Sequence, residues 1–246
     1  MYKYVMRLDK YLFSVGLANS RNKANELILS GKVIINDLVC VKPSKDISDS
    51  DKVILSGDFK QFVSRGAFKL KGAVERFNIA IKDCVCLDIG SSTGGFTEVL
   101  LNLGAKKVYA VDVGEGQLDP SLLKNFRIVS MENTDIRDLD KNSFAEEIDF
   151  VCVDVSFISI TKILENVFNI LKSGGEGVFL IKPQFEVGRE NVGKGGVVKD
   201  DSLRMGALNK VKDEVVKSGF KIIGEIESPI LGSEGNKEFL LYIKKL

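Results

Sequence analysis

The sequence predicts an α/β fold, in which a mostly parallel sheet of seven strands has an antiparallel last strand and follows a small α+β module. Three observations predict this fold. Residues 85–89 form a short apolar run, which is typical of a buried parallel strand. Glycines follow at once, and residues 96–103 then place apolar side chains on one helical face. The same alternation of strand, loop and helix patterns continues along the chain, which favours a doubly wound sheet.

The elements of the small module follow one another closely. Apolar spacing predicts one helix over residues 7–15 and a second over residues 21–30, with Ser20 as the N-cap of the second. Apolar residues on either side of a turn predict a hairpin over residues 33–41. Residues 44–62 are polar, and we interpret them as the last strand of the module and a linker.

The larger part of the chain alternates between strands and helices. After a helix that begins at Ser64, the strands are predicted at residues 85–89, 107–111, 126–131, 150–153, 177–181, 220–227 and 239–244. The intervening helices are predicted at residues 96–103, 158–171 and 201–218. We expect the last two strands to pair as an antiparallel edge. The chain is therefore divided into a module of residues 1–58, a linker of residues 59–63 and a large domain of residues 64–246.

Charge is distributed unevenly along the chain. Residues 1–45 hold eight Lys and Arg residues against three acidic ones, a net charge of +5, so the rest carries −4 for the total of +1. A basic head on a mildly acidic body suggests that the head meets a polyanion. No apolar run approaches a membrane span, and the first residues lack the apolar core of a signal peptide. We therefore expect a cytoplasmic protein with no membrane partner.

The residue types that are absent restrict the chemistry. The chain has no histidine, which removes the commonest metal ligand and the commonest general base. Its four cysteines match no zinc-binding spacing, so the sequence predicts no metal site. Any general base must be Lys, a carboxylate, Tyr or Cys.

The loop after the first large-domain strand indicates the ligand. Asp88 stands two residues before Gly90, where it would repel a pyrophosphate but suit a cationic ligand that carries an amino acid. Asp112 ends the next strand, where it can accept hydrogen bonds from ribose hydroxyls. S-adenosylmethionine has both features, so we predict a Rossmann-like class I methyltransferase domain. Asp135 is placed to meet the adenine amino group, although it could equally cap the following turn.

The alternative interpretation of this loop is a glycine turn with a capping Asp. The strand, the helix and the second acid together favour cofactor binding, because a motif counts only in its context. The predicted cofactor-binding residues are Asp88, Gly90, Ser91, Thr93, Gly94, Phe96, Asp112 and Asp135.

Polar residues at other strand ends indicate the reaction. Asp154 and Lys182 follow the fourth and fifth strands, whose carboxyl ends should lie beside the cofactor loop. Both side chains should therefore stand near the transferable methyl group. Phe157 and Phe185 could stack a base, although packing under a loop is the commoner role of such residues.

The basic head resembles an S4 RNA-binding domain over residues 5–55. The resemblance is carried by Arg7-Leu8-Asp9-Lys10, Ser20-Arg21-x-x-Ala24, Gly31-x-Val33-x-Ile35-Asn36 and Lys42-Pro43. It implies an RNA-facing surface, to which we add one residue at the start of the first predicted helix of the large domain. The expected RNA-binding residues are Arg7, Lys10, Arg21, Lys23, Lys32 and Arg65. The glycine-rich residues 188–197 are too polar for a core, which indicates a lid or an RNA-contacting loop.

The large domain resembles the FtsJ-type ribose 2′-O-methyltransferases, through the order Lys69, Asp154, Lys182 and Glu238. With the S4 head, the whole chain resembles the TlyA family, whose members are described both as haemolysins and as cytidine 2′-O-methyltransferases of ribosomal RNA. The resemblance implies ribosomal RNA or ribosomal subunits as the partner and 23S rRNA as the main target, with 16S rRNA as a second. It implies no DNA partner.

The expected chemistry begins with the ribose hydroxyl, which is a poor nucleophile until its proton is removed. Lys182 is the candidate base, and a free lysine with a pKa of about 10.4 is protonated at neutral pH. Lys69 and the cofactor sulfonium, both cationic, would lower the pKa of Lys182, and burial would act in the same direction. Asp154 is expected to orient the lysine, and Glu238 to position Lys69 and the ribose.

Three other functions are weighed against this one. Methyltransferases that act on the amine of a base typically carry a motif with two prolines after the fourth strand, and residues 154–157 contain no proline. A membrane-lysing haemolysin would need an apolar span or a strongly basic amphipathic helix, and the sequence shows neither. An RNA-binding module with an inactive methyltransferase body is disfavoured by the complete tetrad. The sequence leaves open the modified nucleotide and the oligomeric state.

Overall fold

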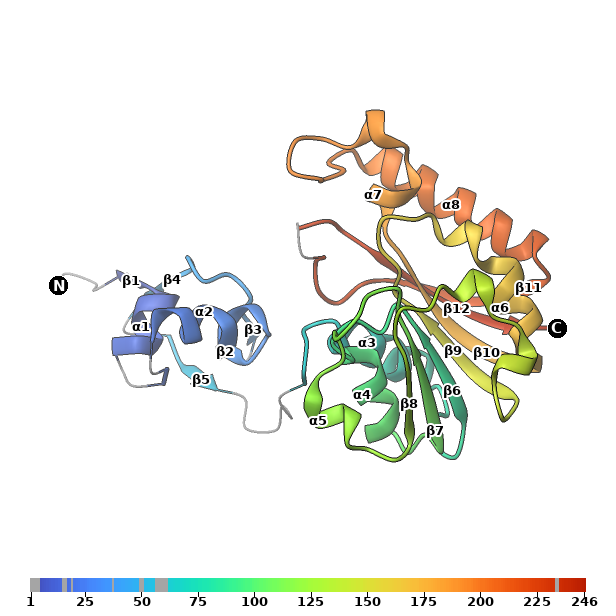
Figure 1. Cartoon of the computed structure of the whole chain (residues 1–246). Coiled ribbons are helices and arrows are strands. Elements are labelled where there is room, and N and C mark those ends of the chain that lie inside the picture. The colour runs from blue at the N-terminus through green and yellow to red at the C-terminus, as the bar shows by residue number, and fades with distance from the viewer. Residues whose placement is uncertain are drawn as a thin grey trace. The chain divides into compact units, whose positions relative to one another are not determined.

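A computed structural model describes residues 5–14, 17–18, 20–36, 38–48, 51–55, 62–232 and 235–246. The chain divides into two compact units, residues 1–61 and residues 62–246 (Figure 1). Most of the predicted linker, residues 59–61, lies outside the described residues. Each unit is therefore considered separately.

The N-terminal unit combines two helices with two small antiparallel sheets. Its elements are β1 (Val5–Arg7), α1 (Leu8–Ser14), α2 (Arg21–Leu29), β2 (Val33–Ile35), β3 (Leu38–Val39), β4 (Asp46–Ser48) and β5 (Val53–Leu55). Leu8, Leu12 and Ile28 fill its core with no exposed surface. The predicted helices and hairpin are present. The structure adds β1, which pairs with β4, and divides the predicted last strand into β4 and β5, because strands of three residues are too short to show alternation.

The C-terminal unit is built on a seven-stranded sheet in the order β11-β12-β10-β9-β6-β7-β8. Its strands are β6 (Val85–Ile89), β7 (Lys107–Val111), β8 (Ile128–Met131), β9 (Ile148–Val153), β10 (Leu171–Ile181), β11 (Phe220–Glu227) and β12 (Phe239–Lys245). The five strands from β10 to β8 pair in parallel, and β12 pairs antiparallel with both β10 and β11. The predicted α/β class and the antiparallel last strand are confirmed. β12 enters the sheet between β10 and β11, so β11 forms the edge.

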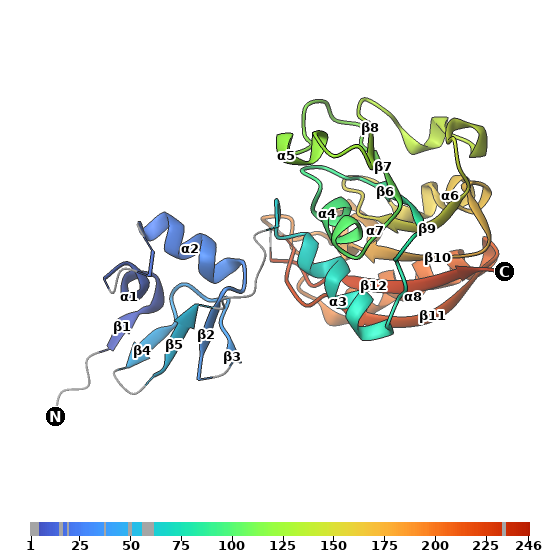
Figure 2. The same cartoon turned by 90° about the horizontal axis from the view of Figure 1, so that it is seen from below.

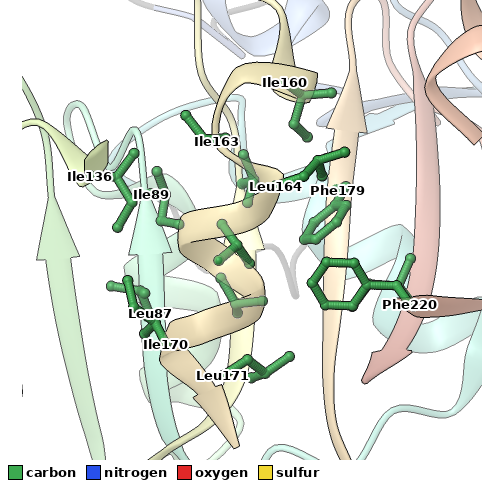
Figure 3. Close-up of a cluster of buried hydrophobic side chains, with 14 of the residues drawn as sticks. Leu87, Ile89, Ile136, Ile160, Ile163, Leu164, Ile170, Leu171, Phe179 and Phe220 are labelled. Carbon is green, nitrogen blue, oxygen red and sulfur yellow. The ribbon is translucent and has the colours of Figure 1, made fainter. Parts of the chain in front are cut away.

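Helices cover both faces of this sheet (Figures 1 and 2). The helices are α3 (Ala67–Phe77), α4 (Gly95–Asn102), α5 (Pro120–Leu123), α6 (Leu164–Ile170), α7 (Pro183–Glu186) and α8 (Asp201–Lys217), with 3-10 helices η1 (Ile136–Asp138), η2 (Lys141–Ser143), η3 (Ile160–Lys162) and η4 (Arg189–Asn191). α3 and α4 pack their apolar residues in one buried cluster, and α6 and α8 pack theirs in another on the opposite face. Figure 3 shows Leu164 and Ile170 of α6 together with Leu87, Ile89 and Phe179 of the sheet.

One predicted helix differs in the structure. Residues 158–171 were expected to form a single helix, but η3 and α6 divide this segment. Ile163 lies between them with a φ of −120°, outside the helical region, because η3 follows the tighter 3-10 geometry. Ile163 and Ile160 are both buried against the sheet, so apolar spacing alone does not reveal the interruption.

Candidate active site

The site lies where the strand order of the sheet reverses. The chain passes from β6 outward to β7 and β8, and then returns to β9 on the other side of β6. Doubly wound sheets bind ligands at the carboxyl ends of their strands at such a point. Gly90 follows β6 with a φ of +80°, and a Cβ at this position would lie 2.4 Å from the carbonyl oxygen of Asp154. The close approach and the left-handed backbone both require glycine here.

A first cavity of about 450 Å³ lies beyond the ends of β6, β7 and β9. Its apolar lining includes Val111, Ile136 and Ile158. Two carboxylates, those of Asp112 and Asp135, also belong to the lining. Apolar walls with a few polar groups are typical of a site for a nucleoside-sized ligand.

The two carboxylates of the first cavity are held differently. Asp112 accepts hydrogen bonds of 2.8 Å from the backbone N–H groups of Ser92 and Gly114, so the loops after β6 and β7 fix its orientation. Asp135 accepts hydrogen bonds from the Arg137 guanidinium and backbone N–H, and it caps η1. The hydrogen bond from the Arg137 side chain lowers the pKa of Asp135. Asp135 therefore caps the following turn and lines the cavity at the same time.

A second, smaller cavity of about 130 Å³ lies at the glycine loop. Ser91 and Thr93 of the loop and Phe96 at the start of α4 line it, together with Ser64 from the segment before α3. A Cβ at Gly95 would lie 2.2 Å from the Ser64 hydroxyl oxygen, so glycine at this position lets the segment approach the start of α4.

A third cavity of about 480 Å³ contains the four residues of the predicted tetrad, Lys69, Asp154, Lys182 and Glu238. Lys182 Nζ lies 2.5 Å from Asp154 Oδ1 and donates a hydrogen bond of 2.8 Å to Ser156 Oγ. Lys69 Nζ donates a hydrogen bond of 2.6 Å to Glu238 Oε2. The cavity therefore holds two lysine–carboxylate pairs.

The sheet register explains how residues so distant in sequence meet. Ile181 of β10 pairs directly with Phe239 of β12, so the residues next to them, Lys182 and Glu238, lie at the same edge of the sheet. Lys69 reaches Glu238 from α3, and both side chains are buried. A buried charged group is tolerated only when an opposite charge bonds to it, and Lys69 and Glu238 neutralise each other in this way.

The three cavities share Gly90, Ser92 and Asp154. They are therefore neighbouring parts of one site. A ligand that fills the first two cavities would present its central atoms to the third, beside the Lys182–Asp154 pair.

Comparisons with known proteins agree with this geometry. Residues 62–245 match the family model of the FtsJ-like methyltransferases, and residues 6–53 match that of the S4 domain. A 16S/23S rRNA (cytidine-2′-O)-methyltransferase TlyA from Mycobacterium tuberculosis is 44% identical over 239 residues, which cover 97% of this chain and 89% of that protein. The chain belongs to the FtsJ-like methyltransferases, in the TlyA family.

Other relatives of this methyltransferase carry a different name. Hemolysin A of Brachyspira hyodysenteriae is 45% identical over 238 residues, which cover 96% of this chain and 99% of that protein. A solved structure of a candidate hemolysin from Streptococcus thermophilus has 40% identity and a TM-score of 0.75, and the match covers 98% of this chain and 88% of that one. The family cofactor is S-adenosylmethionine, and the apolar walls and carboxylates of the first cavity suit its adenosine part.

The structure places Asp88 of this methyltransferase beneath the glycine loop. Its side chain has no exposed surface and lines none of the three cavities. It accepts hydrogen bonds from the Thr97 hydroxyl at 2.6 Å and from the Cys152 thiol at 3.5 Å. Burial raises the pKa of Asp88 to about 7, although the Thr97 hydrogen bond acts in the opposite direction.

The other predicted cofactor-binding residues either line a cavity or allow the glycine loop to pack. Gly90, Ser91, Thr93, Phe96, Asp112 and Asp135 line the first or the second cavity. Gly94 lines none of the three cavities. Its φ is +94°, and a Cβ there would lie 2.3 Å from the Leu122 side chain, so Gly94 allows the loop to pack on α5.

The predicted RNA-binding residues lie in both units. Arg65 lines the third cavity of the methyltransferase unit. In the N-terminal unit, Arg7 and Arg21 both bond to Asp9, whose pKa they lower, and both guanidinium side chains are about half exposed. Lys10 is exposed, whereas Lys23 and Lys32 are half-buried.

Some lining residues were not predicted. Ser156 bonds to Lys182, and its position two residues after Asp154 at a strand end is a signal that could have identified it. Ser64 lines two cavities, and it was noted only as the first residue of a predicted helix, which in the structure begins at Ala67. Gln117 and Thr134 line the first cavity from loops that no motif marks.

Proposed function

We propose that this protein transfers the methyl group of S-adenosylmethionine to the ribose 2′-hydroxyl of a cytidine in ribosomal RNA. One observation carries the proposal. The third cavity, which holds both lysine–carboxylate pairs, shares the lining residue Asp154 with the first and second cavities. The name of the M. tuberculosis relative supports cytidine 2′-O-methylation of 16S and 23S rRNA. We propose 23S rRNA as the main target, 16S rRNA as the second and the cytoplasm as the location.

The cofactor would occupy the first two cavities. The adenine would lie between the apolar side chains of the first cavity and meet Asp135, while Asp112 would accept hydrogen bonds from the ribose hydroxyls. The methionine part would lie in the second cavity, beside Thr93 and Phe96. Asp88 would act from beneath the loop, as a carboxylate near the cationic part of the ligand. The bound cofactor supplies an activated methyl group on a positively charged sulfur.

Lys182 would accept the proton of the 2′-hydroxyl on its side-chain nitrogen. Asp154 and Ser156 hold its nitrogen from two sides, which fixes the direction in which the amine points. Lys69 would bind the acceptor ribose, and Glu238 would hold Lys69 in place. Alignment of the hydroxyl with the methyl group would supply much of the rate enhancement, because the donor is already activated.

The N-terminal unit would hold the RNA through its positive surface. Arg7, Lys10 and Arg21 are exposed on α1, α2 or the strand before them, and phosphate contacts of this kind position RNA without reading its sequence. Arg65 would add a contact at the third cavity. We assign residues 1–58 to this binding module, residues 59–63 to the linker and residues 64–246 to the methyltransferase domain.

The decisive experiment incubates the protein and tritium-labelled S-adenosylmethionine with separated ribosomal subunits that lack the modification. The label is then mapped by resistance to alkaline hydrolysis, because a 2′-O-methyl group blocks cleavage at its own phosphodiester and a base methyl does not. Label at a cytidine that resists hydrolysis supports the proposal. Label on a base, or no label on either subunit, contradicts it.

Membrane lysis is the second candidate, because two similar proteins carry the name hemolysin. Within the described ranges, no helix has the length and apolar character that crossing a bilayer requires. The test compares liposome leakage with the wild-type protein and with an Asp154→Ala variant. Leakage by both proteins in the absence of RNA and cofactor would support lysis as a separate activity.

A further inference from the structure

Asn236 is a buried amide that lies two residues before Glu238. It has 1% of its surface exposed, and its side chain bonds to a segment about forty residues earlier in the chain. Its Oδ1 accepts a hydrogen bond of 2.9 Å from the Val198 N–H, and its Nδ2 donates one of 2.8 Å to the Gly196 carbonyl. Both partners lie in residues 188–199 between α7 and α8, a segment that extends the glycine-rich residues 188–197 by two residues and is called the glycine-rich loop from here on.

The loop end is held from a second side. The Val198 side chain is buried, and the Val198 carbonyl accepts a hydrogen bond of 2.6 Å from Arg204 Nη1 of α8. The two polar backbone groups of Val198 are therefore bonded to two different elements. Gly196, whose carbonyl is bonded to Asn236, lines the third cavity together with the tetrad.

Asn236 is also linked to Glu238 through the backbone. Its carbonyl accepts a hydrogen bond of 2.9 Å from the Gly232 N–H. Gly232 in turn lies against the Glu238 carboxylate, since a Cβ at this glycine would be 2.4 Å from Glu238 Oε1. One residue therefore contacts both a wall of the third cavity and the segment that surrounds the Glu238–Lys69 pair.

Only an amide provides the two bonds that this place requires. The side chain must accept from one backbone group and donate to another, and Asn supplies a carbonyl and an NH₂ group in fixed geometry. An aspartate supplies acceptors only and would face the Gly196 carbonyl with a negative charge. A leucine of similar size supplies neither, and would leave two buried backbone groups unpaired, which is costly.

We propose that Asn236 is a positioning residue for methyl transfer, which fixes the glycine-rich loop as a wall of the acceptor cavity and aligns it with Glu238. This inference rests on the proposed function, because it assigns the third cavity to the RNA ribose. Asn236 lines none of the three cavities and acts through Gly196 and Glu238. Its loss should therefore affect turnover and the KM for RNA, while the affinity for S-adenosylmethionine stays the same.

The first test measures the loop directly. Lys194 and Lys199 are exposed cleavage sites for trypsin in the loop. Limited proteolysis of Asn236→Asp and Asn236→Leu should cut at these two lysines about tenfold faster than in the wild type, since the freed loop end opens more often. Asn191→Asp is the matched control, because its amide lies on the exposed surface of the same loop and bonds to nearby residues of the chain, Val187 and Glu190, and not to the segment around Glu238. This control should be cut at the wild-type rate.

The second test measures catalysis on the same proteins. Both Asn236 variants should lower kcat by about tenfold or more and raise the KM for RNA, with the dissociation constant for S-adenosylmethionine within twofold of the wild type. Unchanged proteolysis, or equal losses of cofactor affinity and turnover, would overturn the proposal. If the proposed RNA reaction itself fails, no wild-type turnover appears, but the proteolysis result still stands.

A further variant covers the case in which the Asn236 variants do not fold. Arg204→Gln removes the other bond to Val198 and leaves Asn236 and Glu238 intact. It should accelerate cleavage at Lys199 and leave the alignment of Glu238 unchanged, so kcat should fall less than twofold. A loss of turnover of about tenfold or more in Arg204→Gln itself would show that loop attachment alone matters, and would contradict the link to Glu238.

Discussion

The two lysine–carboxylate pairs of the third cavity have the same chemistry but different surroundings. Lys69 and Glu238 are joined at 2.6 Å with side chains 10% and 3% exposed, and they connect α3 to the segment before β12. Lys182 and Asp154 are joined at 2.5 Å, but Asp154 is 20% exposed and lines all three cavities. The first pair holds distant parts of the chain together, whereas the second faces the place where two ligands would meet.

This difference predicts the largest effect for removal of Lys182. Lys182→Ala should lower methyl transfer about 10²- to 10⁴-fold, the range typical of a lost general base, with the affinity for S-adenosylmethionine within threefold of the wild type. Single-turnover transfer at saturating RNA measures the first quantity, and calorimetric titration of the cofactor measures the second.

The control for Lys182→Ala is Lys162→Ala, which removes an exposed lysine of η3 that lines none of the three cavities. Transfer by this control should equal that of the wild type. A loss of cofactor binding in Lys182→Ala, parallel to the loss of transfer, would place Lys182 in the cofactor site instead of at the acceptor.

The buried pair should matter more for stability than the open pair. Glu238→Gln leaves the Lys69 ammonium buried without a counter-charge, and should lower the free energy of unfolding by about 3 kcal/mol. Asp154→Asn should cost less, about 1 kcal/mol, because Lys182, whose side chain is also only 10% exposed, keeps its hydrogen bond to Ser156 and lines an open cavity. Urea unfolding of both variants measures the contrast.

A double variant separates charge from packing at the buried pair. Lys69→Met with Glu238→Leu should recover about 2 kcal/mol of the loss, since replacing a whole buried pair by apolar groups is often neutral. It should remain inactive in methyl transfer. Equal destabilisation by Glu238→Gln and Asp154→Asn would remove the distinction between the two pairs.

The same two pairs show how far the sequence predicts the site. Asp154 and Lys182 were placed from the pattern alone, because the carboxyl ends of neighbouring parallel strands must meet at one edge. Lys69 and Glu238 were placed by resemblance. These two residues come together because β12 lies between β10 and β11 in the sheet. The residue pattern of a strand does not predict which strands it pairs with.

The cofactor-binding region shows a different limit to what the sequence predicts. The strand, the glycine loop and α4 are contiguous in sequence, so the fold of this region was predicted closely. The burial of Asp88 was not, because its strand has a fully buried pattern and gives no alternation to show which way a side chain points. Asp112, one residue past its strand, lines the cavity as the pattern predicts.

Asp88 extends the comparison to a buried carboxylate that has neutral hydrogen-bond partners. Burial raises its pKa to about 7, above the value of about 4 in an unfolded chain. Between these values the folded state holds a proton that the unfolded state has released. The contribution of Asp88 to stability is therefore complete below pH ~4 and is lost as the pH rises through ~7, by about 1 kcal/mol per pH unit.

Asp88→Asn should remove this dependence, because its amide oxygen can still accept the Thr97 hydrogen bond without titrating. Urea unfolding at pH 5, 6, 7 and 8 should show the wild type losing stability relative to the variant up to about pH 7 and no further. Asp213→Asn, on the exposed surface of α8, is the control and should run parallel to the wild type. Parallel curves for Asp88→Asn as well would show that Asp88 is ionised in the folded protein throughout this range.

The smallest effect is expected for an arginine beside Asp9, a buried carboxylate that accepts hydrogen bonds from two guanidinium groups. Arg7 and Arg21 share it, and both keep about half of their side-chain surface for a ligand. Arg21→Gln should weaken RNA binding about threefold and reduce the slope of log affinity against log salt by about 0.7, the value for one phosphate contact on a single strand. Methyl transfer at saturating RNA should not change.

Lys52→Gln, which removes an exposed lysine outside the predicted RNA-binding surface, is the control. An unchanged salt slope in Arg21→Gln would mean that Arg21 serves only to neutralise Asp9, as Lys69 neutralises Glu238.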